Sequence, residues 1–366
     1  MASSKRRSTW RSRRGSSSPN RKGECCGCTK HSTGCVRPRG HGRPSWTPPW
    51  RHSGFITGAS NDDIQRFKEE MKHSFRMSDL GMLSYYLGIE VRQNSSGTTL
   101  SPTAYANTIL EKAGLQGCNP CNVPMEARLK LSKTSAASLV DVTHYCSVVR
   151  SLWYLVHTRP DIAYAVGYVS RFMEQPTEEH WSAVKHLLCY VTGTLDYGCI
   201  LGRGSGGTAE LIGFSDSDMA GDVDTRKSTS GVLFFLGGSP VSWQSMKQKV
   251  VALSSCEAEY IVATTAACQG IWLARLLGDL VGEALKAATL LVDNKSAISL
   301  IKNPVYHERS KHIDLRFHYI RECVENDQIL VEFTSTEKQL ADILTKPLGR
   351  VKFQELREKI GVIKIK

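Results

Sequence analysis

The sequence predicts a mixed α/β (α+β) fold in which helices flank a five-stranded sheet in the C-terminal part of the chain. Three short apolar runs bounded by turn residues, LIGFSD, GVLFFLGG and SPVSWQS, predict three successive antiparallel strands. Two further runs, TLLVD and ILVEFTS, alternate with helical patterns, which predicts parallel strand–helix units. Together they predict one mixed sheet covered by helices.

The chain has 366 residues, enough for two or three domains. Its net charge of +12 arises entirely within residues 1–54, because basic and acidic residues are equal in number in the rest of the chain. The global charge of residues 55–366 therefore gives no support for nucleic-acid binding, and such a function must rest on local sites.

Residues 1–54 are rich in Ser, Arg, Gly and Pro without periodicity, which predicts a disordered basic tail. Its KRR and RSRR runs serve either in nuclear import or RNA tethering, or only as a solvated surface. Four tail residues suggest a zinc knuckle, but their spacing, C-x2-C-x2-H-x3-C, favours a chance cluster: Cys25, Cys28, His31 and Cys35.

Twelve cysteines without a secretory signal indicate reduced intracellular thiols, in the cytoplasm or the nucleus. Cys118 and Cys121 form a lone C-x-x-C pair, which we interpret as loop because no second ligand pair accompanies it. No apolar run approaches the ~20 residues that span a bilayer, so we expect no membrane association. We also expect no small-molecule cofactor.

Residues 55–200 alternate between helical and strand patterns. Asp62 or Asp63 caps an expected helix, LSYYLGIEV predicts a strand, and AYANTILEKAGL predicts a helix. After a loop at about 118–140, residues 141–199 are expected to be mostly helical, and a Gly-rich linker follows at 202–208. The predicted organisation is therefore a tail (1–54), a middle region (55–200) and a C-terminal domain (205–366).

Four acids in the C-terminal domain carry the functional hypothesis. Asp216 and Asp293 each end an apolar strand run, so their carboxylates are expected at one edge of the sheet. In SSCEAEY, Glu257 fits a capping box, whereas Glu259 heads the apolar stripe that packs on the sheet and therefore needs a metal or cationic partner. Asp342 lies in QLADILTKPL. Clustered carboxylates repel one another, which indicates a divalent metal site.

The loop DSDMAGDVDTRK resembles a calcium-binding loop only superficially. Its twelfth position, where a bidentate Glu is required, is Lys227. We therefore interpret Asp218, Asp222 and Asp224 as solvated loop acids.

From Phe55 onward the chain resembles the C-terminal part of a copia-type LTR-retrotransposon Pol polyprotein. The resemblance is carried by FRMSDLGMLSYYLGIEV, HTRPDIAYAVGYVSRFM, GFSDSDMAGDVDTRKSTSG, ALSSCEAEY, VDNKSAI, RSKHIDLRFHYIRE and QLADILTKPL. It implies the end of a reverse-transcriptase region (thumb and connection) followed by a ribonuclease-H-like domain.

The family activity is cleavage of RNA in an RNA–DNA hybrid by a two-metal mechanism with Mg²⁺ (or Mn²⁺). By motif, the resemblance places the catalytic and metal-binding acids at Asp216, Glu259, Asp293 and Asp342. Asn294 and Lys295 are implied to contact substrate, with Lys295 replacing a common glutamine.

The sequence also departs from the family pattern. The segment before FITGAS lacks a Y-V-D-D motif, so we expect no reverse-transcriptase activity. The alternative to an active ribonuclease is a catalytically silent remnant that acts at most as a nucleic-acid or protein binding module. Other retroelement polyprotein segments are possible partners.

Overall fold

The computed structural model describes residues 61–76, 78, 81–95, 97–202, 210–282, 286–302 and 314–365, with the side chains of 61, 63 and 314–318 excepted. Its contacts separate Met1–His52 from Ser53–Lys366, and every described element belongs to the second unit. The predicted disordered tail with its cysteine cluster, and nearly all of the predicted linker, lie outside the described residues.

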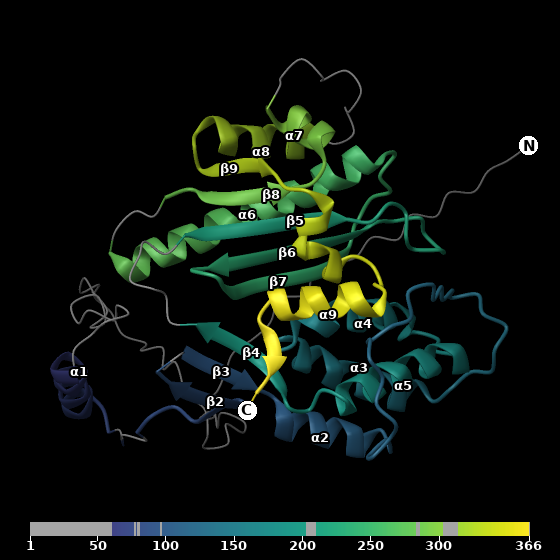
Figure 1. Ribbon diagram of the computed structural model, residues 1–366, viewed down its shortest axis with the longest axis horizontal. Helices are drawn as coiled ribbons and strands as arrows, with labels where there is room; N and C mark the ends of the chain where they lie inside the picture. The colour runs from purple at the N-terminus through teal and green to yellow at the C-terminus, as the bar shows by residue number, and fades with distance from the viewer. Residues whose placement is uncertain are drawn as a thin grey trace, which may run out of the picture. The chain divides into compact units, whose positions relative to one another are not determined.

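A mixed five-stranded sheet forms in the second half of the described chain, in the order β7-β6-β5-β8-β9 (Figure 1). β5 pairs antiparallel with β6 and parallel with β8, while β6–β7 is antiparallel and β8–β9 parallel. This arrangement confirms the predicted ribonuclease-H-like fold class. The strands are β5 (Leu211–Ser217), β6 (Thr229–Leu236), β7 (Ser239–Lys247), β8 (Ala288–Val292) and β9 (Ile329–Phe333).

The strand β6 separates two hydrophobic cores, because successive side chains of a strand point to opposite faces. Val232 and Phe234 pack with the long helix α6 (Ser255–Val281), which crosses one face of the sheet (Figure 1). Leu233 and Phe235 belong to a core that also contains the helices of the middle region. Both faces of the sheet are therefore covered.

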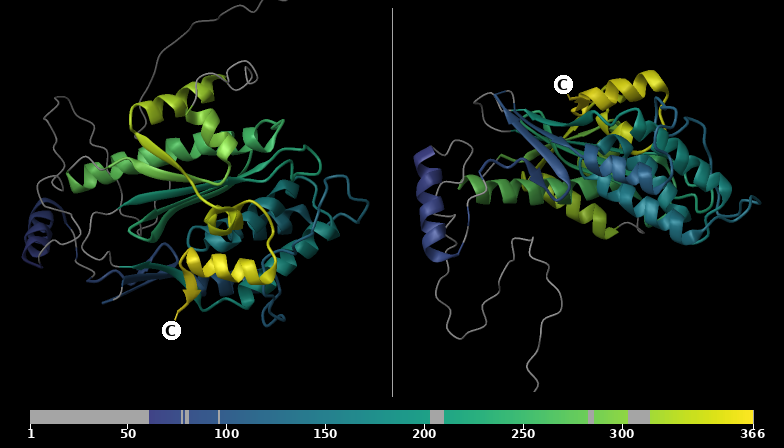
Figure 2. Two further views of the ribbon diagram at one scale, coloured as in Figure 1. Left: turned by 45° about the horizontal axis from the view of Figure 1, so that its top comes forward. Right: turned by 90° about the horizontal axis from the view of Figure 1, so that it is seen from below.

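The middle region contains a second sheet, of order β1-β2-β3-β4-β10, and a group of helices beside it (Figures 1 and 2). The helices are α1 (Asn61–Ser74), α2 (Thr103–Lys112), α3 (Val142–Val156), η2 (Pro160–Ile162), α4 (Ala163–Val169), η3 (Ser170–Phe172) and α5 (Glu178–Thr192). The strands are β1 (Tyr85–Tyr86), β2 (Ile89–Asn94), β3 (Gly97–Ser101), β4 (Tyr197–Gly202) and β10 (Val362–Lys364).

Two features of this sheet differ from expectation. The strand predicted for LSYYLGIEV is divided, because Leu87 and Gly88 both adopt positive φ and turn the chain back, so that β1 pairs with β2. The strand β10, which we did not predict, joins β4 from the far end of the sequence. The division between residues 55–200 and 205–366 stays a prediction, and the two regions share a sheet and a core.

The last elements are α7 (Lys295–Lys302), α8 (Asp314–Glu325), η6 (Thr336–Lys338), η7 (Leu340–Leu344) and α9 (Arg350–Lys359). The helix predicted for EKQLADILTK is wrong in type, because the segment forms two 3₁₀ turns. Gln339 between them is extended, donates from Nε2 to the Ser215 carbonyl 2.8 Å away, and accepts from the Ala341 N–H. These hydrogen bonds of Gln339 hold the chain against β5 and prevent one continuous helix.

Among the described helices, α6 alone is long and apolar enough to cross a membrane by length and composition. Its N-terminal half packs on the sheet, with buried residues that include Ala258, Val262 and Ala266. The helix therefore serves here as the core helix of the sheet.

Gly231 in β6 allows η7 to lie directly against the sheet. A Cβ at this position would be 2.9 Å from the Ala341 carbonyl oxygen and 2.7 Å from Thr345 Cγ2. We expect Gly231→Ala to displace η7 and to lower the free energy of unfolding by about 1–3 kcal/mol, as overpacking does. Urea unfolding measures this. Gly237→Ala is the control for backbone strain alone, because Gly237 has positive φ but open space around it. Equal losses of unfolding free energy in the two variants would contradict a clash with η7.

Candidate metal centre

The sheet register brings Asp216 and Asp293 together. Parallel pairing of β5 with β8 places Ser215 opposite Val292, so the next residue on each strand is one of these aspartates. Asp216 is 3% exposed at the end of β5, and Asp293 is half-buried just beyond β8. The predicted meeting of these two carboxylates at one edge is confirmed.

Glu259 reaches the same place from the second turn of α6. Its Oε1 accepts a hydrogen bond from the Ser217 N–H at 2.9 Å, whereas its buried Oε2 has no hydrogen-bond partner among the described residues. One carboxylate oxygen from each of Asp216, Glu259 and Asp293 lies within 4.8 Å of the others. The three acids thus form a compact group with an unsatisfied oxygen.

Glu257 has the structural role that the sequence predicts. The Ser254 hydroxyl accepts a hydrogen bond from the Glu257 N–H at 3.1 Å, and Glu257 Oε2 accepts one from the Leu253 N–H at 2.8 Å. Both bonds satisfy the start of α6, and the first acid of SSCEAEY is therefore a cap.

The fourth predicted acid, Asp342, lies in η7, which contacts β5 and β6. It is buried, but it is not one of the three acids whose oxygens lie within 4.8 Å of each other. Its Oδ1 is 2.7 Å from Lys346 Nζ. The same segment supplies Thr345, whose hydroxyl donates to Asp216 Oδ2.

Thr345 and Lys346 contact the acids of the site and were not predicted from the sequence. The spacing in DILTKPL could have indicated them, because one helical turn brings residues three and four positions after Asp342 back beside it. Thr336, whose hydroxyl donates to Asp293 Oδ2 at 3.1 Å, was missed as well. It lies after β9, on a different segment from the aspartate that it orients.

Burial dominates the electrostatics of the cluster. It raises the pKa of Asp216 to about 7, with a further rise from Asp342 and Asp293, against which Lys346 acts. Burial, and then the charges of Asp216 and Asp293, raise the pKa of Glu259 to about 9. The pKa of Asp293 is also raised, first by burial. Without a cation the site therefore holds protons at neutral pH.

The donor set fits a hard divalent cation. Carboxylate oxygens are the ligands that Mg²⁺ and Mn²⁺ prefer. The three clustered carboxylates need positive charge nearby, and Glu259 Oε2 has no hydrogen-bond partner in the described part of the chain. Lys346 supplies part of that charge from the Asp342 side. The residues present can hold such an ion.

The acidic loop after β5 is structural, and part of our prediction for it is wrong. Asp222 is buried instead of solvated, with Arg171 Nη1 and Lys247 Nζ each 3.1 Å from its Oδ2. Burial raises its pKa, but hydrogen bonds from Thr225 and Lys247 outweigh this and hold it at about 2. The cations that fix Asp222 lie on η3 and β7, so the loop sequence alone could not reveal them.

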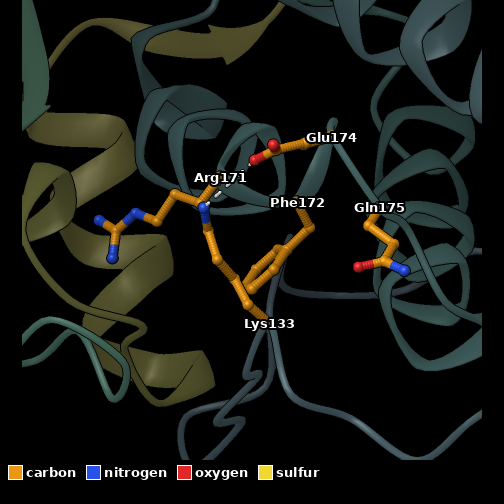
Figure 3. Close-up of a pocket in the computed structure, with 5 residues that line it drawn as sticks. All are labelled: Lys133, Arg171, Phe172, Glu174 and Gln175. Carbon is orange, nitrogen blue, oxygen red and sulfur yellow. Dashed lines mark ion pairs between the residues drawn. The ribbon is translucent and has the colours of Figure 1, made fainter. Parts of the chain in front are cut away.

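A surface pocket beside this loop is separate from the acid cluster. It is lined by Lys133, Arg171, Phe172, Glu174 and Gln175. Figure 3 shows the Arg171 guanidinium directed away from the other side chains, and the Lys133–Glu174 ion pair spans 3.9 Å. None of the four predicted acids lines the pocket.

The two predicted substrate residues have contacts within the protein. Asn294 Oδ1 accepts a hydrogen bond from the Ala297 N–H at 3.0 Å, which caps α7. The Lys295 ammonium lies 4.8 Å from the centre of the Phe333 ring. Their contact with substrate stays a prediction.

The raised pKa values predict how pH and metal affect stability. The unfolded carboxyls ionise near pH 4, whereas in the folded protein Asp216 and Glu259 ionise near 7 and 9. Between these limits the folded state binds more protons, so metal-free stability falls as pH rises. Because a metal ion displaces these protons, we expect Mg²⁺ to raise the melting temperature more at about pH 9 than at about pH 6.

Thermal melts with Mg²⁺ or chelator at the two pH values measure this effect. Asp216→Asn/Glu259→Gln is the matched variant, and it should lose both the pH dependence from these groups and most of the Mg²⁺ effect. An equal Mg²⁺ shift in the variant would contradict the assignment.

The sheet order and the carboxylate cluster at its strand ends place the second half of the chain in the class of ribonuclease-H-like domains. Residues 52–127 match the family model described as reverse transcriptase (RNA-dependent DNA polymerase). Over 316 residues the chain is 43% identical to a retrovirus-related Pol polyprotein from transposon TNT 1-94 of Nicotiana tabacum, which covers 84% of this chain and 24% of that protein. The transposon RE2 polyprotein of Arabidopsis thaliana is 40% identical over 310 residues, 85% of this chain and 21% of that protein.

A shorter relative is covered almost completely. The uncharacterized mitochondrial protein AtMg00810 of Arabidopsis thaliana is 38% identical over 217 residues, 59% of this chain and 89% of that protein. The chain belongs to the copia-type LTR-retrotransposon Pol polyprotein family. It spans only about a fifth to a quarter of the length of the first two relatives.

Two solved structures are similar at a low level. A ribonuclease H domain from Mycobacterium tuberculosis matches 41% of this chain and 98% of its own, with 10% identity and a TM-score of 0.30. A foamy viral protease-reverse transcriptase in complex with RNA/DNA hybrid matches 73% of this chain and 30% of its own, with 12% identity and a TM-score of 0.44. The fold assignment rests on the strand order itself.

Proposed function

We propose that the chain is a ribonuclease that cleaves the RNA strand of an RNA–DNA hybrid and depends on Mg²⁺ or Mn²⁺. The observation that carries this proposal is the group of three carboxylates within 4.8 Å, at the edge of a ribonuclease-H-like sheet. Family membership indicates the substrate, since an RNA-dependent DNA polymerase produces such hybrids.

Asp216, Glu259 and Asp293 would hold the metal, and Asp342 would complete the site once its carboxylate is released from Lys346. Bound Mg²⁺ supplies activation of a water nucleophile and stabilisation of the leaving oxygen. Thr345 and Thr336 orient the carboxylates of Asp216 and Asp293, and the Ser217 N–H fixes Glu259. These contacts preorganise the ligands before the metal arrives.

Substrate class and metal are tested together with full-length protein. RNA labelled at one end is supplied single-stranded, paired with RNA, or paired with DNA, in Mg²⁺, Mn²⁺ or chelator. We expect internal cleavage only of the hybrid and only with metal. Cleavage that persists in chelator, or that is equal for all three substrates, would contradict the proposal.

The alternative function is a silent module that binds nucleic acid or protein. Hybrid binding without cleavage by the wild-type chain in either metal would identify it. We propose further that the protein acts inside the cell, in the cytoplasm or nucleus, with other polyprotein segments as possible partners, and that residues 55–200 and 205–366 are its two functional regions.

A further inference from the structure

The loop that contains the C-x-x-C pair packs tightly against the C-terminal half of α5. The Cys121 N–H donates to the Cys189 carbonyl at 3.2 Å. A Cβ at Gly193 would lie 2.8 Å from Pro120 Cβ, so a residue without a side chain is needed there. This contact joins two segments that are far apart in the sequence and brings their thiols together.

Three thiols and one imidazole meet at this contact. Cys121 Sγ is 3.8 Å from His186 Nδ1, and the Cys189 thiol interacts with the thiols of Cys118 and Cys121, which help burial to raise its pKa. His186 and Cys189 are three positions apart on α5, which places them on one face of the helix. All four residues are half-buried, so the cluster is partly shielded and still open to an ion from solvent.

The orientation of His186 is fixed in the manner of a metal ligand. Its Nε2 is 3.0 Å from the Val123 carbonyl oxygen, which only accepts hydrogen bonds, so Nε2 carries the proton. In the neutral ring, Nδ1 then presents its lone pair on the side of Cys121. Ligating histidines commonly donate their other ring nitrogen to a carbonyl in this way.

We propose that Cys118, Cys121, His186 and Cys189 bind one Zn²⁺ ion. The two pairs, C-x2-C in the loop and H-x2-C on the helix, supply the three thiolates and one imidazole of a structural zinc site. This set is soft and contains no carboxylate, in contrast to the acid cluster of β5, α6 and β8.

Binding requires side-chain rotations. Among the described residues, the three acids alone already have their ligand atoms within 4.8 Å of one another. The thiols and the imidazole interact instead in separate pairs, Cys121 with His186 and Cys189 with each of the two loop thiols. They would close around the ion as the thiols lose their protons to solvent. The bound ion would fasten the loop to α5, independently of any catalytic activity.

The test uses the full-length chain with Cys25, Cys26, Cys28 and Cys35 changed to Ser, so that tail thiols do not contribute. The reduced protein is titrated with Co²⁺ and then with Zn²⁺. We expect one equivalent of Co²⁺ to produce a thiolate charge-transfer band and tetrahedral d–d bands, Zn²⁺ to remove both, and Zn²⁺ to raise the melting temperature.

Variants locate the site. Cys189→Ser should abolish the thiolate-rich spectrum, and His186→Asn should weaken metal binding at least tenfold. Cys268→Ser, at an exposed thiol of α6, is the matched control and should keep the starting spectrum. If Cys189→Ser does not fold, Cys118→Ser and Cys121→Ser, changed in the loop, replace it.

Several results would overturn the proposal. One is the absence of thiolate bands in the folded starting protein, and another is an unchanged spectrum in the folded Cys189→Ser variant. A third is a disulfide among these cysteines that persists under reducing conditions, because it would leave no thiols to bind the metal.

Discussion

Asp216→Asn is expected to abolish cleavage of the hybrid and at the same time to stabilise the metal-free protein. The carboxylate is 3% exposed, and burial raises its pKa to about 7, so at about pH 8 its charge opposes folding. Asparagine keeps the shape and still accepts the hydrogen bond from Thr345. Loss of a metal ligand should lower the cleavage rate by at least about 100-fold.

The stability gain is measured by urea unfolding in chelator at about pH 8. We expect an increase of about 1–3 kcal/mol, since each unit of pKa shift corresponds to about 1.4 kcal/mol. Asp279→Asn, at an exposed position of α6, is the matched control and should change neither stability nor cleavage. A destabilised Asp216→Asn protein would contradict the interpretation of this acid as a metal ligand whose buried charge opposes folding.

Asp161→Asn is expected to cause the largest loss of stability in the middle region. The fully buried Arg159 makes two hydrogen bonds to the Asp161 carboxylate, at 2.9 and 2.7 Å. The Tyr190 hydroxyl donates to the same carboxylate at 2.7 Å. Neutralising Asp161 leaves the guanidinium charge buried without its counter-ion, which costs about 3–5 kcal/mol.

A double-mutant cycle distinguishes a lost charge partner from a lost contact. Arg159→Met/Asp161→Asn removes both charges, so the double variant should be less destabilised than the sum of the two single variants. Urea unfolding of all four proteins gives the coupling. Additive losses, or a loss below about 1 kcal/mol for Asp161→Asn, would show that the pair is not energetically coupled.

The sequence was most informative where local pattern decides structure. Apolar runs ending in acids located Asp216 and Asp293 because a strand end fixes the position of the residue that follows it. The contrast between Glu257 and Glu259 came from helix periodicity and capping, and both placements agree with the structure.

Features that depend on contacts between distant segments could not be predicted. The β10–β4 pairing joins the C-terminal strand to residues 197–199, in the middle of the described chain. Asp222 looked solvated because its partners Arg171 and Lys247 lie on other elements. Cys118 and Cys121 were interpreted as loop because the second pair is on α5, and Cys121 and His186 are 65 residues apart.

The most direct test of the acid cluster is single-turnover cleavage of a hybrid whose RNA strand is labelled, with Mg²⁺ added and then removed by chelator. Wild-type protein and Asp279→Asn should cut the RNA while metal is present and stop when it is chelated, and Asp216→Asn should not cut. Equal rates for wild type and Asp216→Asn, or no cleavage by the folded wild-type protein, would contradict the proposed ribonuclease function.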